Sequence, residues 1–491
     1  MTEAAHPSGD DASIAAADFD DRLPPLPPTD ELLVPVEATE RRVIAVDDDP
    51  TGTQTTAHAA LVTAWEPADL DWLLAQPGPI GFVLTNSRAR PVDEAVAVTT
   101  DVGRGLRAAA ERAGLRLDVV SRGDSTLRGH FPEEPAALAA GLGLAYPTLV
   151  IMPFFAEGGR ATVHGTHYVL TDGRYVPAGA TPFARDPSFG YTASHLPAWV
   201  EEKSGGDILQ DEVTVIDIGI VRRGVDAVAA ALRAVSAGSC VVIDAVEAAD
   251  VEIVGAAFAV LRPEGRPWLF RSAAGLVPAL AGLRAAAPVS TAGVPVTRSG
   301  GLIVVGSHVP LSTRQLGRLL AADPDLHAVE ASVDSLAEAS TALDEVARLS
   351  ATATDAIAAE RTVVVHTSRA VRTDLVPDDA LARSRAVAEG LCEVVRRISV
   401  RPSYVVAKGG ITAHTLATAA LGARRAHVIG PIAAGVPMWE LGADIRHPGL
   451  PYVVFPGNVG DDDALALVVG RLEHRRRILI DGALDRRGGR P

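Results

Sequence analysis

Residues 117–143 read LDVVSRGDSTLRGHFPEEPAALAAGLG and contain the unit from which the fold can be predicted. The apolar run at 117–120 is typical of a buried strand, and the alanine- and leucine-rich run at 133–143 is typical of a helix. Between them lies SRGDSTLRGH, a polar decade with two arginines, an aspartate and three hydroxyl groups. A strand, a polar loop and a helix in this order form the repeating unit of α/β folds with a parallel sheet.

The same unit recurs on both sides of this stretch. In the first half we predict further strands at Val43–Val46, Ile80–Leu84, Leu149–Met152, Val213–Ile218 and Cys240–Ile243, with helices at 93–113, 224–237 and 247–262. In the second half we predict strands at Leu302–Val305, Thr362–His366, Tyr404–Ala407, His427–Ile429 and Tyr452–Phe455, with helices near 312–322, 335–358, 378–398, 412–420 and 462–474. The pattern predicts α/β domains with mainly parallel sheets.

A length of 491 residues is too great for one hydrophobic core, so we expect two domains. A stretch rich in alanine, proline and glycine, about 284–300, interrupts the alternation of strands and helices. We therefore place one domain at 41–285 and a second at 300–480, and we expect the two to face each other across a central cleft. Residues 1–40 are acidic and proline-rich, which predicts a flexible tail or a segment that wraps over a neighbour.

Charge and composition exclude several classes of protein. The net charge of −16 argues against a nucleic-acid-binding surface and against attachment to an anionic membrane. The two cysteines are isolated, which favours a reducing compartment. There is no apolar run near the ~20 residues of a membrane helix, and the N-terminus shows no signal-peptide pattern. We expect a soluble cytoplasmic protein.

Three adjacent carboxylates, Asp47, Asp48 and Asp49, directly follow the first strand and precede Thr51 and a glycine. Carboxylates this close repel one another, so a cation, hydroxyl groups or backbone amides should compensate them. One interpretation is an ordinary turn, because Asp-Pro and Thr-Gly are common in turns. The other is a site at which carboxylates bind sugar hydroxyls or assist proton transfer.

Three more polar loops follow predicted strands, and together they favour the second interpretation. They read TNSRAR at 85–90 with Arg88, SRGDSTLRGH at 121–130, and PFFAEGGRATVHGTHYV at 153–169. Such hydroxyl, guanidinium, imidazole and carboxylate groups suit a small polyhydroxylated acid, whose carboxylate an arginine would pair. His164 and His167 could instead be ordinary surface or structural histidines, and without a third strong ligand we predict no metal bound by protein side chains.

The second half has glycine turns between predicted strands and helices. Gly306-Ser307 follows one strand, Lys408-Gly409-Gly410-Ile411-Thr412 follows another, and Gly457-Asn458-Val459-Gly460 follows a third. Glycine turns let backbone amides approach an anion, and one of these turns holds a rare lysine, since arginine supplies nearly all the basic residues. Each turn alone could be ordinary glycine turn chemistry, but three predict a nucleotide-phosphate site. The Asp461–Asp463 run reads as a helix cap.

These stretches together resemble the four-carbon acid sugar kinases. The family's ADD-x-TG is similar to residues 48–52, its K-x-DSTLRG to residues 122–129, and its GR-x-T-x-x-G to residues 159–165. In the second half, the GS turn, the glycine pair before a threonine and the PGNFG motif are similar to residues 306–307, 409–412 and 456–460. Arg122 stands where the family commonly has lysine, and the stretch at 186–206 is extended. Both departures bear on the exact substrate.

The resemblance implies a kinase that transfers the γ-phosphoryl group of ATP, with Mg²⁺, to the 4-hydroxyl of a threonate, erythronate or oxo-tetronate. The first domain would bind the acid and the second ATP, and we expect a homodimer. Asp124 and Asp49 would be catalytic, with Asp124 the preferred base. The other acid-sugar contacts would be Asp48, Thr51, Arg88, Arg122, Ser125, Thr126, Arg128, Arg160, Thr162 and His164; the nucleotide contacts would be Ser307, Lys408, Gly409, Gly410, Ile411, Thr412, Gly457, Asn458 and Gly460.

Two other functions are compatible with parts of this pattern. A lyase or aldolase acting on the same acids would use aspartate and histidine as acid and base, but the sequence shows neither a metal trio nor a clear Schiff-base lysine. A two-domain sensor of sugar acids would need the first pocket but not three phosphate-type turns.

Overall fold

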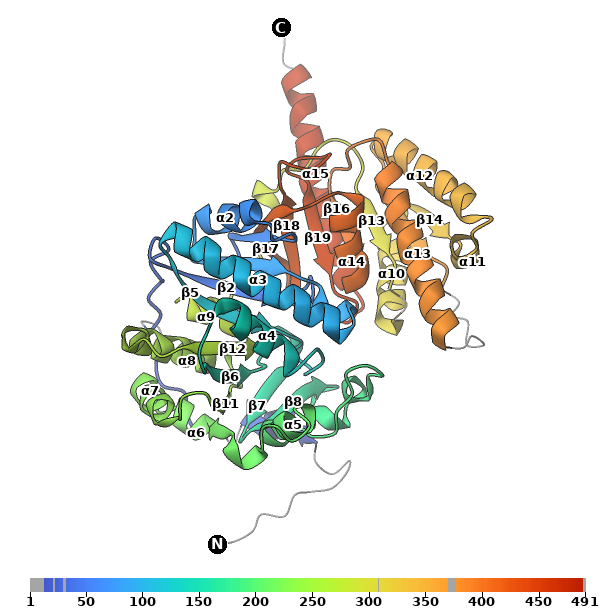
Figure 1. Ribbon diagram of the computed structural model, residues 1–491. Helices are drawn as coiled ribbons and strands as arrows, with labels where there is room; N and C mark the ends of the chain where they lie inside the picture. The colour runs from blue at the N-terminus through green and yellow to red at the C-terminus, as the bar shows by residue number, and fades with distance from the viewer. Residues whose placement is uncertain (1–12, 21–22, 30–31, 308, 370–376, 489–491) are drawn as a thin grey trace. The chain divides into compact units, whose positions relative to one another are not determined.

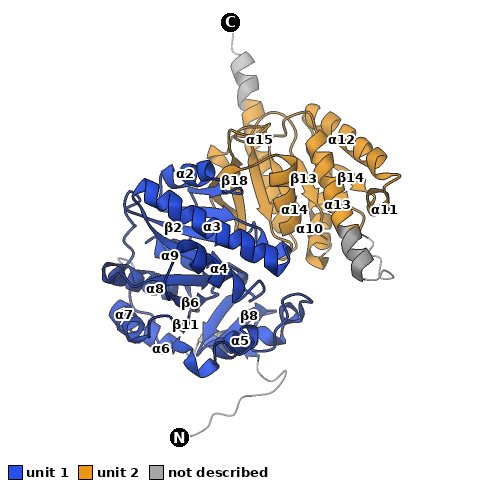
Figure 2. Ribbon diagram, viewed as in Figure 1, with its two compact units in different colours: residues 1–285 blue, residues 286–491 orange. Residues whose placement is uncertain are grey.

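The computed structural model describes residues 13–20, 23–29, 32–307, 309–369 and 377–488. The chain divides into two compact units, residues 1–285 and 286–491 (Figures 1 and 2). This division falls inside the stretch rich in alanine, proline and glycine that we took as the linker.

Unit 1 is built on a parallel sheet, as predicted. Its strand order is β10-β11-β6-β12-β5-β2-β4-β3, and every neighbouring pair is parallel. The strands are β2 (Arg41–Asp47), β3 (Ala59–Val62), β4 (Ile80–Leu84), β5 (Arg116–Arg122), β6 (Thr148–Met152), β10 (Thr214–Ile216), β11 (Cys240–Ile243) and β12 (Trp268–Ser272). Central strands such as β2 and β4 are nearly continuous runs of buried residues, which is typical of a sheet covered on both faces.

Helices cover this sheet (Figure 1). They are α2 (Pro67–Ala75), α3 (Val92–Ala113), α4 (Glu133–Leu142), α5 (Leu196–Lys203), α6 (Ile218–Val221), α7 (Val225–Ala234), α8 (Ala248–Leu261) and α9 (Leu276–Leu280). Helices α3 and α4 pack closely, because a Cβ on Gly103 would lie 2.9 Å from the Leu138 carbonyl oxygen. This packing fixes α4, which follows the polar loop of β5.

A small antiparallel sheet in the order β1-β9-β8-β7 adds to unit 1. Its strands are β1 (Ile14–Ala15), β7 (Arg160–Val163), β8 (Thr166–Thr171) and β9 (Arg174–Pro177). This sheet and strands β3 and β12 were not predicted, because their apolar runs are short or interrupted by polar residues. Residue 218, predicted to end a strand, begins α6 instead, since Asp217 caps that helix by accepting from the Ile220 amide at 2.9 Å.

The prediction of a flexible tail is wrong for part of residues 1–40. Strand β1 pairs with β9, and α1 (Ala16–Asp20) follows it. Phe19 is buried and stacks on Tyr175, with ring centroids 4.1 Å apart. Arg222 donates to the Pro24 carbonyl oxygen at 2.7 Å. An aromatic side chain and a strand pairing thus hold this segment on unit 1 despite its acidic, proline-rich composition.

Unit 2 has a mostly parallel sheet in the order β17-β18-β19-β16-β13-β15-β14, in which β17, β18 and β19 pair antiparallel. The strands are β13 (Leu302–Val305), β14 (His327–Ala331), β15 (Val363–Thr367), β16 (Val405–Lys408), β17 (Arg425–Ala433), β18 (Val436–Leu441) and β19 (Pro451–Phe455). Strands β14 and β18 were not predicted; β18 contains Pro437, which is unusual inside a strand.

The helices of unit 2 are α10 (Pro310–Ala322), α11 (Val333–Ala337), α12 (Ala342–Ala358), α13 (Pro377–Arg397), α14 (Gly410–Thr415) and α15 (Ala464–Gly488). The single helix predicted at 335–358 is two helices, α11 and α12. Both units are α/β with mainly parallel sheets, which confirms the predicted fold class. None of the helices in the described ranges is long and apolar enough to cross a membrane.

Candidate active site

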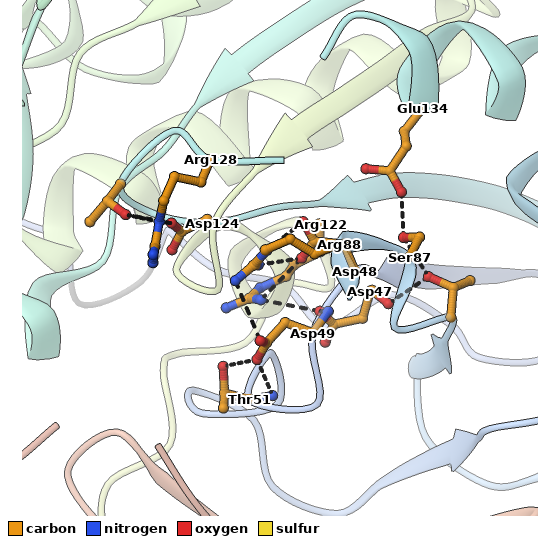
Figure 3. Close-up of polar contacts among 12 residues, drawn as sticks. Asp47, Asp48, Asp49, Thr51, Ser87, Arg88, Arg122, Asp124, Arg128 and Glu134 are labelled. Atoms are coloured by element: carbon orange, nitrogen blue, oxygen red, sulfur yellow. Dashed lines mark hydrogen bonds and ion pairs between the residues drawn. The ribbon is translucent and has the colours of Figure 1, made fainter. Parts of the chain in front are cut away.

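The three aspartates lie at the carboxyl end of β2 and are compensated by arginines (Figure 3). Asp47 is buried, and its Oδ1 accepts from Arg122 Nη1 at 3.1 Å and from the Asp49 amide at 3.3 Å. Burial raises the pKa of Asp47 to about 7, against the opposing effect of the Arg122 charge. The arginines are thus the groups that compensate the three carboxylates, and both interpretations of the sequence, a turn and a sugar-binding site, are compatible with this geometry.

Arg88 lies in a short 3₁₀ turn after β4 and binds two of these carboxylates. Its Nη2 and Nε donate to Asp48 Oδ1 and Oδ2 at 2.5 and 3.1 Å, a bidentate pair, and its Nη1 lies 3.4 Å from Asp49 Oδ2. Burial opposes the charge of Arg88, but Asp48 and Asp49 outweigh it and hold the pKa above the usual range. Asp49 is the more accessible partner, and its Oδ1 also accepts from the Thr51 hydroxyl at 2.5 Å.

Gly52 lets the backbone of this loop approach the Asp47 carboxylate. A Cβ at position 52 would lie 1.6 Å from Asp47 Oδ2. Because the Asp47 side chain is buried, it cannot move away to relieve this clash. We therefore expect Gly52→Ala to lower the free energy of unfolding by about 1–3 kcal/mol, as overpacking does. Urea unfolding measures the change.

Gly470→Ala is the matched control for that prediction, because a methyl group at position 470 in α15 would meet no neighbouring heavy atom of the described residues within 4 Å. Alanine favours a helix over glycine, so this variant should be as stable as the parent protein or more stable, by up to about 1 kcal/mol. Equal stability of the two variants would contradict the close approach at Gly52.

The loop after β5 presents Asp124, Thr126 and Arg128 together. Asp124 Oδ2 accepts from the Thr126 hydroxyl and from Arg128 Nε at 2.6 Å (Figure 3). Burial alone would raise the pKa of Asp124, but Arg88 and Arg128 lower it far below its usual range. Asp124 is therefore a permanent carboxylate in a cationic setting. Ser125, also predicted here, is buried in the same loop.

Arg160 begins β7, is partly buried, and has few hydrogen-bond or ion-pair partners. Its Nη1 donates to the Gly158 carbonyl oxygen, its Nε is buried without a hydrogen bond, and no carboxylate of the described residues lies within 4 Å of it. Burial lowers the pKa of Arg160, although Asp124 partly opposes this. The guanidinium carbons of Arg160 and Arg128 lie 5.7 and 5.2 Å from the ring centroid of Phe183. This arrangement suits an anion that comes from outside the chain.

Two predicted contacts of the acid sugar lie elsewhere. Thr162 is 1% exposed, and its hydroxyl bonds to His167 Nδ1 at 2.9 Å, so it supports the site from behind. His164 is exposed on a turn whose amides bond to the buried Asp244. Burial raises the pKa of Asp244 to about 6. The structure does not bring the His164 side chain into contact with the aspartate–arginine cluster.

The sequence analysis missed a buried network behind the cluster. Arg271, on the unpredicted strand β12, donates to Ser121 Oγ at 3.1 Å and lies 3.6 Å from Glu134 Oε2. Glu134 Oε1 accepts from the Ser87 hydroxyl, and burial raises the pKa of Glu134 (Figure 3). A Cβ on Gly123 would lie 2.3 Å from Arg271 Cζ, so glycine is needed there. The network links strands β12 and β5 to helix α4 and to the turn after β4.

The glycine turns of unit 2 meet at the carboxyl ends of β13, β16 and β19. Ser312 Oγ lies 3.1 Å from both Ser307 Oγ and the Gly457 carbonyl oxygen, which joins the first and third turns. A Cβ on Gly306 would lie 2.5 Å from Thr412 Oγ1, so the residues that follow the second turn pack against the first turn. Gly409 has a φ of +113°, a conformation that favours glycine. The predicted residues Gly410 and Ile411 begin α14, and Asn458 and Gly460 lie in the third turn; Ile411 and Asn458 are exposed.

Lys408 ends β16 and is fully buried. Its Nζ donates to the Pro456 carbonyl oxygen at 2.5 Å and lies 4.0 Å from the ring centroid of Phe455. Burial lowers the pKa of Lys408 to about 7. The lysine thus holds the third turn rather than projecting outward. It also removes one sequence argument against a lyase, because a buried amine with a lowered pKa does exist in the chain.

Arg369 is a further cation at these turns that the sequence analysis missed. It follows β15, and its Nη1 donates to the Ser307 carbonyl oxygen at 2.9 Å while its Nη2 donates to Thr367 Oγ1 at 2.7 Å. No carboxylate within the described ranges pairs with it at 4 Å or less. The signal was present, because TSRA follows the predicted strand 362–366 as polar residues follow the strands of the first half.

Within the described part of the chain, no group of three histidine, cysteine, aspartate or glutamate side chains could hold a metal ion. The carboxylates of the cluster are instead bound by arginines.

Comparisons with known proteins match a sugar-binding model to unit 1 and a nucleotide-binding model to unit 2. A model of a sugar-binding N-terminal domain matches residues 43–280, and a model of a nucleotide-binding C-terminal domain matches residues 302–465. The chain is 28% identical over 450 residues to a D-threonate kinase of Bordetella bronchiseptica, covering 88% of this chain and 97% of that one. It is 30% identical over 177 residues to a 3-oxo-tetronate kinase of Methylobacterium radiotolerans, covering 36% and 39%.

Two solved structures share the fold. One is described as a putative tRNA synthase from Salmonella typhimurium, with a TM-score of 0.64 and 18% identity, covering 87% of this chain and 98% of that one. The other is a Haemophilus influenzae protein of the DUF1537 family, with a TM-score of 0.61 and 17% identity, covering 87% and 99%. With both domain models matched in order along most of its length, the chain belongs to the four-carbon acid sugar kinase family.

Proposed function

We propose that the chain transfers the γ-phosphoryl group of MgATP to the 4-hydroxyl of a four-carbon sugar acid such as threonate, erythronate or an oxo-tetronate. The observation that carries the proposal is Arg160, a cation in protein surroundings with no carboxylate partner among the described residues, near Asp124 and Arg128. Arg160 would pair the carboxylate of the acid, and the hydroxyl groups would bond to the aspartates. The relatives named as threonate and oxo-tetronate kinases support this class of substrate.

In the reaction, the hydroxyl oxygen forms a bond to the γ-phosphorus while the bond from that phosphorus to the β,γ-bridging oxygen breaks, and ADP leaves with the electron pair. Charge neutralisation and positioning supply most of the catalysis of such transfers. Arg160, together with Arg128, would provide positive charge on the side of the acid, because Asp48 and Asp49 balance the charges of Arg88 and Arg122. Mg²⁺ would enter as part of the nucleotide substrate and would neutralise part of the charge of its phosphates.

Asp124 would orient the attacking hydroxyl. Its strongly lowered pKa makes it a weak proton acceptor at rest. The hydroxyl becomes acidic only as its bond to phosphorus forms, so the proton would pass late, to Asp124 or to the more accessible Asp49. The choice between these two carboxylates stays a prediction, as do the central cleft, the cytoplasmic location and the homodimer.

The turns of unit 2 would hold the nucleotide. Backbone amides at Ser307, Gly410–Thr412 and Gly457–Gly460 would bind the phosphates, and Arg369 would add the positive charge that the buried Lys408 does not present. We expect Arg369→Met to raise the KM for ATP about tenfold, as the loss of one charged hydrogen bond would, with the KM for the acid unchanged. Initial rates at varied ATP measure this.

Arg298→Met is the control, because Arg298 pairs with Glu360 on the surface of the same unit at 3.3 Å. It should leave both KM values as they are. An unchanged KM for ATP in Arg369→Met would remove Arg369 from the nucleotide site.

An assay of ADP release with a panel of tetronates and oxo-tetronates, with Mg²⁺ present, tests the proposal. We expect ADP to form with at least one of these acids and a 4-phosphorylated product to accumulate in equal amount. A lyase would split the acid without consuming ATP, and a sensor would bind the acid without turnover. Absence of ADP with every acid would refute the kinase.

The pKa of Asp47 predicts a pH dependence. Below about pH 7 Asp47 is protonated, and the cluster of Asp47, Asp48, Asp49, Arg88 and Arg122 is neutral; above it the cluster carries one negative charge. An anionic acid should therefore bind less well as the pH rises. We expect its KM to increase about fivefold between pH 6 and pH 8, the effect of one nearby charge at intermediate dielectric.

Asp47→Asn provides the comparison for this profile, since asparagine keeps an oxygen acceptor but does not titrate. Its KM for the acid should stay level over the same pH range. A profile with the same slope in both proteins would assign the titration to another group.

A further inference from the structure

The loop at 124–128 has a backbone that needs outside support. Leu127 has a φ of +67°, in the left-handed region that non-glycine residues seldom adopt. The Leu127 side chain is buried among Phe131, Trp199 and other apolar residues, so this conformation cannot relax by turning the side chain outward. Such strain persists only where the surrounding structure holds it, and it is common at functional sites.

Two side chains from other segments hold two successive carbonyl groups of this loop. His167 of β8 has its Nε2 2.8 Å from the Ser125 carbonyl oxygen. Tyr191, from the extended stretch that the family pattern did not account for, donates its hydroxyl to the Thr126 carbonyl oxygen at 2.7 Å. Both side chains are at least 96% buried. The two contacts therefore hold successive peptide groups, the one that joins Ser125 to Thr126 and the one that joins Thr126 to Leu127.

The hydrogen bonds of His167 fix its tautomer. A carbonyl oxygen can only accept, so Nε2 carries the proton, and Nδ1 must accept from the Thr162 hydroxyl at 2.9 Å. Burial lowers the pKa of His167 to about 4 and raises the pKa of Tyr191 above its usual range. Both groups are thus uncharged donors at ordinary pH, unlike the charged groups on the other side of the loop. This makes them suited to hold the loop and unsuited to move a proton.

We propose that His167 and Tyr191 are positioning residues, a clamp that fixes the 124–128 loop so that Asp124 and Arg128 face the acid. The proposal rests on the proposed kinase function for its effect on turnover, while the clamp itself is a property of the folded chain. It also gives a role to Thr162, which sets the orientation of the imidazole, and to the extended stretch that carries Tyr191. Because the clamp holds the loop before the acid sugar arrives, the acid meets a surface already formed.

Tyr191→Phe and Thr162→Val test the clamp, since each removes one hydroxyl and little else. Hydrogen exchange of the protein without ligands, followed by mass spectrometry, should show amides of residues 124–129 exchanging about tenfold faster in both variants. Calorimetric titration should show about tenfold weaker binding of the preferred acid, the loss of about one hydrogen bond. The KM for ATP should not change, which separates a positioning role from a general loss of structure.

Tyr146→Phe is the matched control, because the Tyr146 side chain is 83% exposed and lies outside the site. It should exchange, bind and turn over like the parent protein. Unchanged exchange at 124–129 in Tyr191→Phe and Thr162→Val would overturn the clamp, whatever the enzyme does. Faster exchange in a protein that phosphorylates no tetronate would instead keep the clamp and refute the kinase. If the KM values for the acid and for ATP rose in parallel in both variants, His167 and Tyr191 would be general stabilisers of the fold, and the positioning role would be overturned.

Discussion

Arg160→Met is expected to lower kcat/KM for the sugar acid by about 100-fold or more while leaving the protein at least as stable as before. The loss of affinity follows from the loss of a charge-assisted pair with the carboxylate, worth about 2–5 kcal/mol when partly desolvated. The stability follows from the lack of a carboxylate partner among the described residues. A partly buried cation without an ion-pair partner costs free energy, and methionine fills similar space without that cost. Kinetics at varied acid and thermal unfolding measure the two effects.

Arg266→Met supplies the opposite pattern and serves as the control. Arg266 also lies over an aromatic ring, 4.5 Å from the Trp268 centroid, but its Nη2 donates to Thr148 Oγ1 and to the Ser236 carbonyl oxygen, both at 2.6 Å. Its loss should destabilise the protein and leave kcat/KM unchanged. If Arg160→Met unfolded the protein as Arg266→Met does, Arg160 would be a structural residue and the carboxylate would bind elsewhere.

Asp124→Asn should lower kcat by about 10²–10³, in the range of groups that assist proton transfer. Asparagine keeps the size of the side chain and one oxygen for the Thr126 hydroxyl. It removes the charge that faces Arg88 and Arg128 and cannot take the proton of the attacking hydroxyl. Pre-steady-state quench-flow with saturating acid and ATP measures the chemical step.

Asp118→Asn is the matched control from β5, the strand that precedes this loop. Asp118 accepts from Arg41 Nη1 at 2.5 Å and from Arg262 Nε at 2.9 Å, both away from the cluster. This variant should lose stability and keep its kcat. A kcat for Asp124→Asn within threefold of the parent value would shift the role of proton acceptor to Asp49.

The sequence predicted those parts of the site in which a continuous apolar strand is followed at once by polar residues. Asp47–Asp49 and Asp124–Arg128 come after long buried runs, so both the strand and the loop could be recognised. Arg271 escaped notice because β12, WLFRS, is a short run that becomes polar before it ends. His167 lies in a hairpin in which buried and partly exposed residues alternate, and this pattern does not distinguish a structural histidine from a ligand.

Contacts between distant segments were beyond what the sequence could provide. Nothing in the pattern around Tyr191 shows that its hydroxyl meets a carbonyl group 65 residues earlier. The burial of Lys408 was equally hidden. Its rarity suggested a phosphate contact, but the turn after β19 supplies the Pro456 and Gly457 carbonyl oxygens to its ammonium group. Identity of a side chain indicates its chemistry, while its surroundings decide whether that chemistry is available.

The pairing of β1 with β9 has a practical consequence for anyone who prepares this protein. Strand β9 pairs with β8, which carries His167, and β8 pairs with β7, which begins at Arg160. Removing residues 1–40, so that the protein starts at β2, would remove strand β1 and the Phe19 ring from that small sheet. Weak activity of the shortened protein would then reflect the loss of these contacts and not the activity of the enzyme that retains residues 1–40.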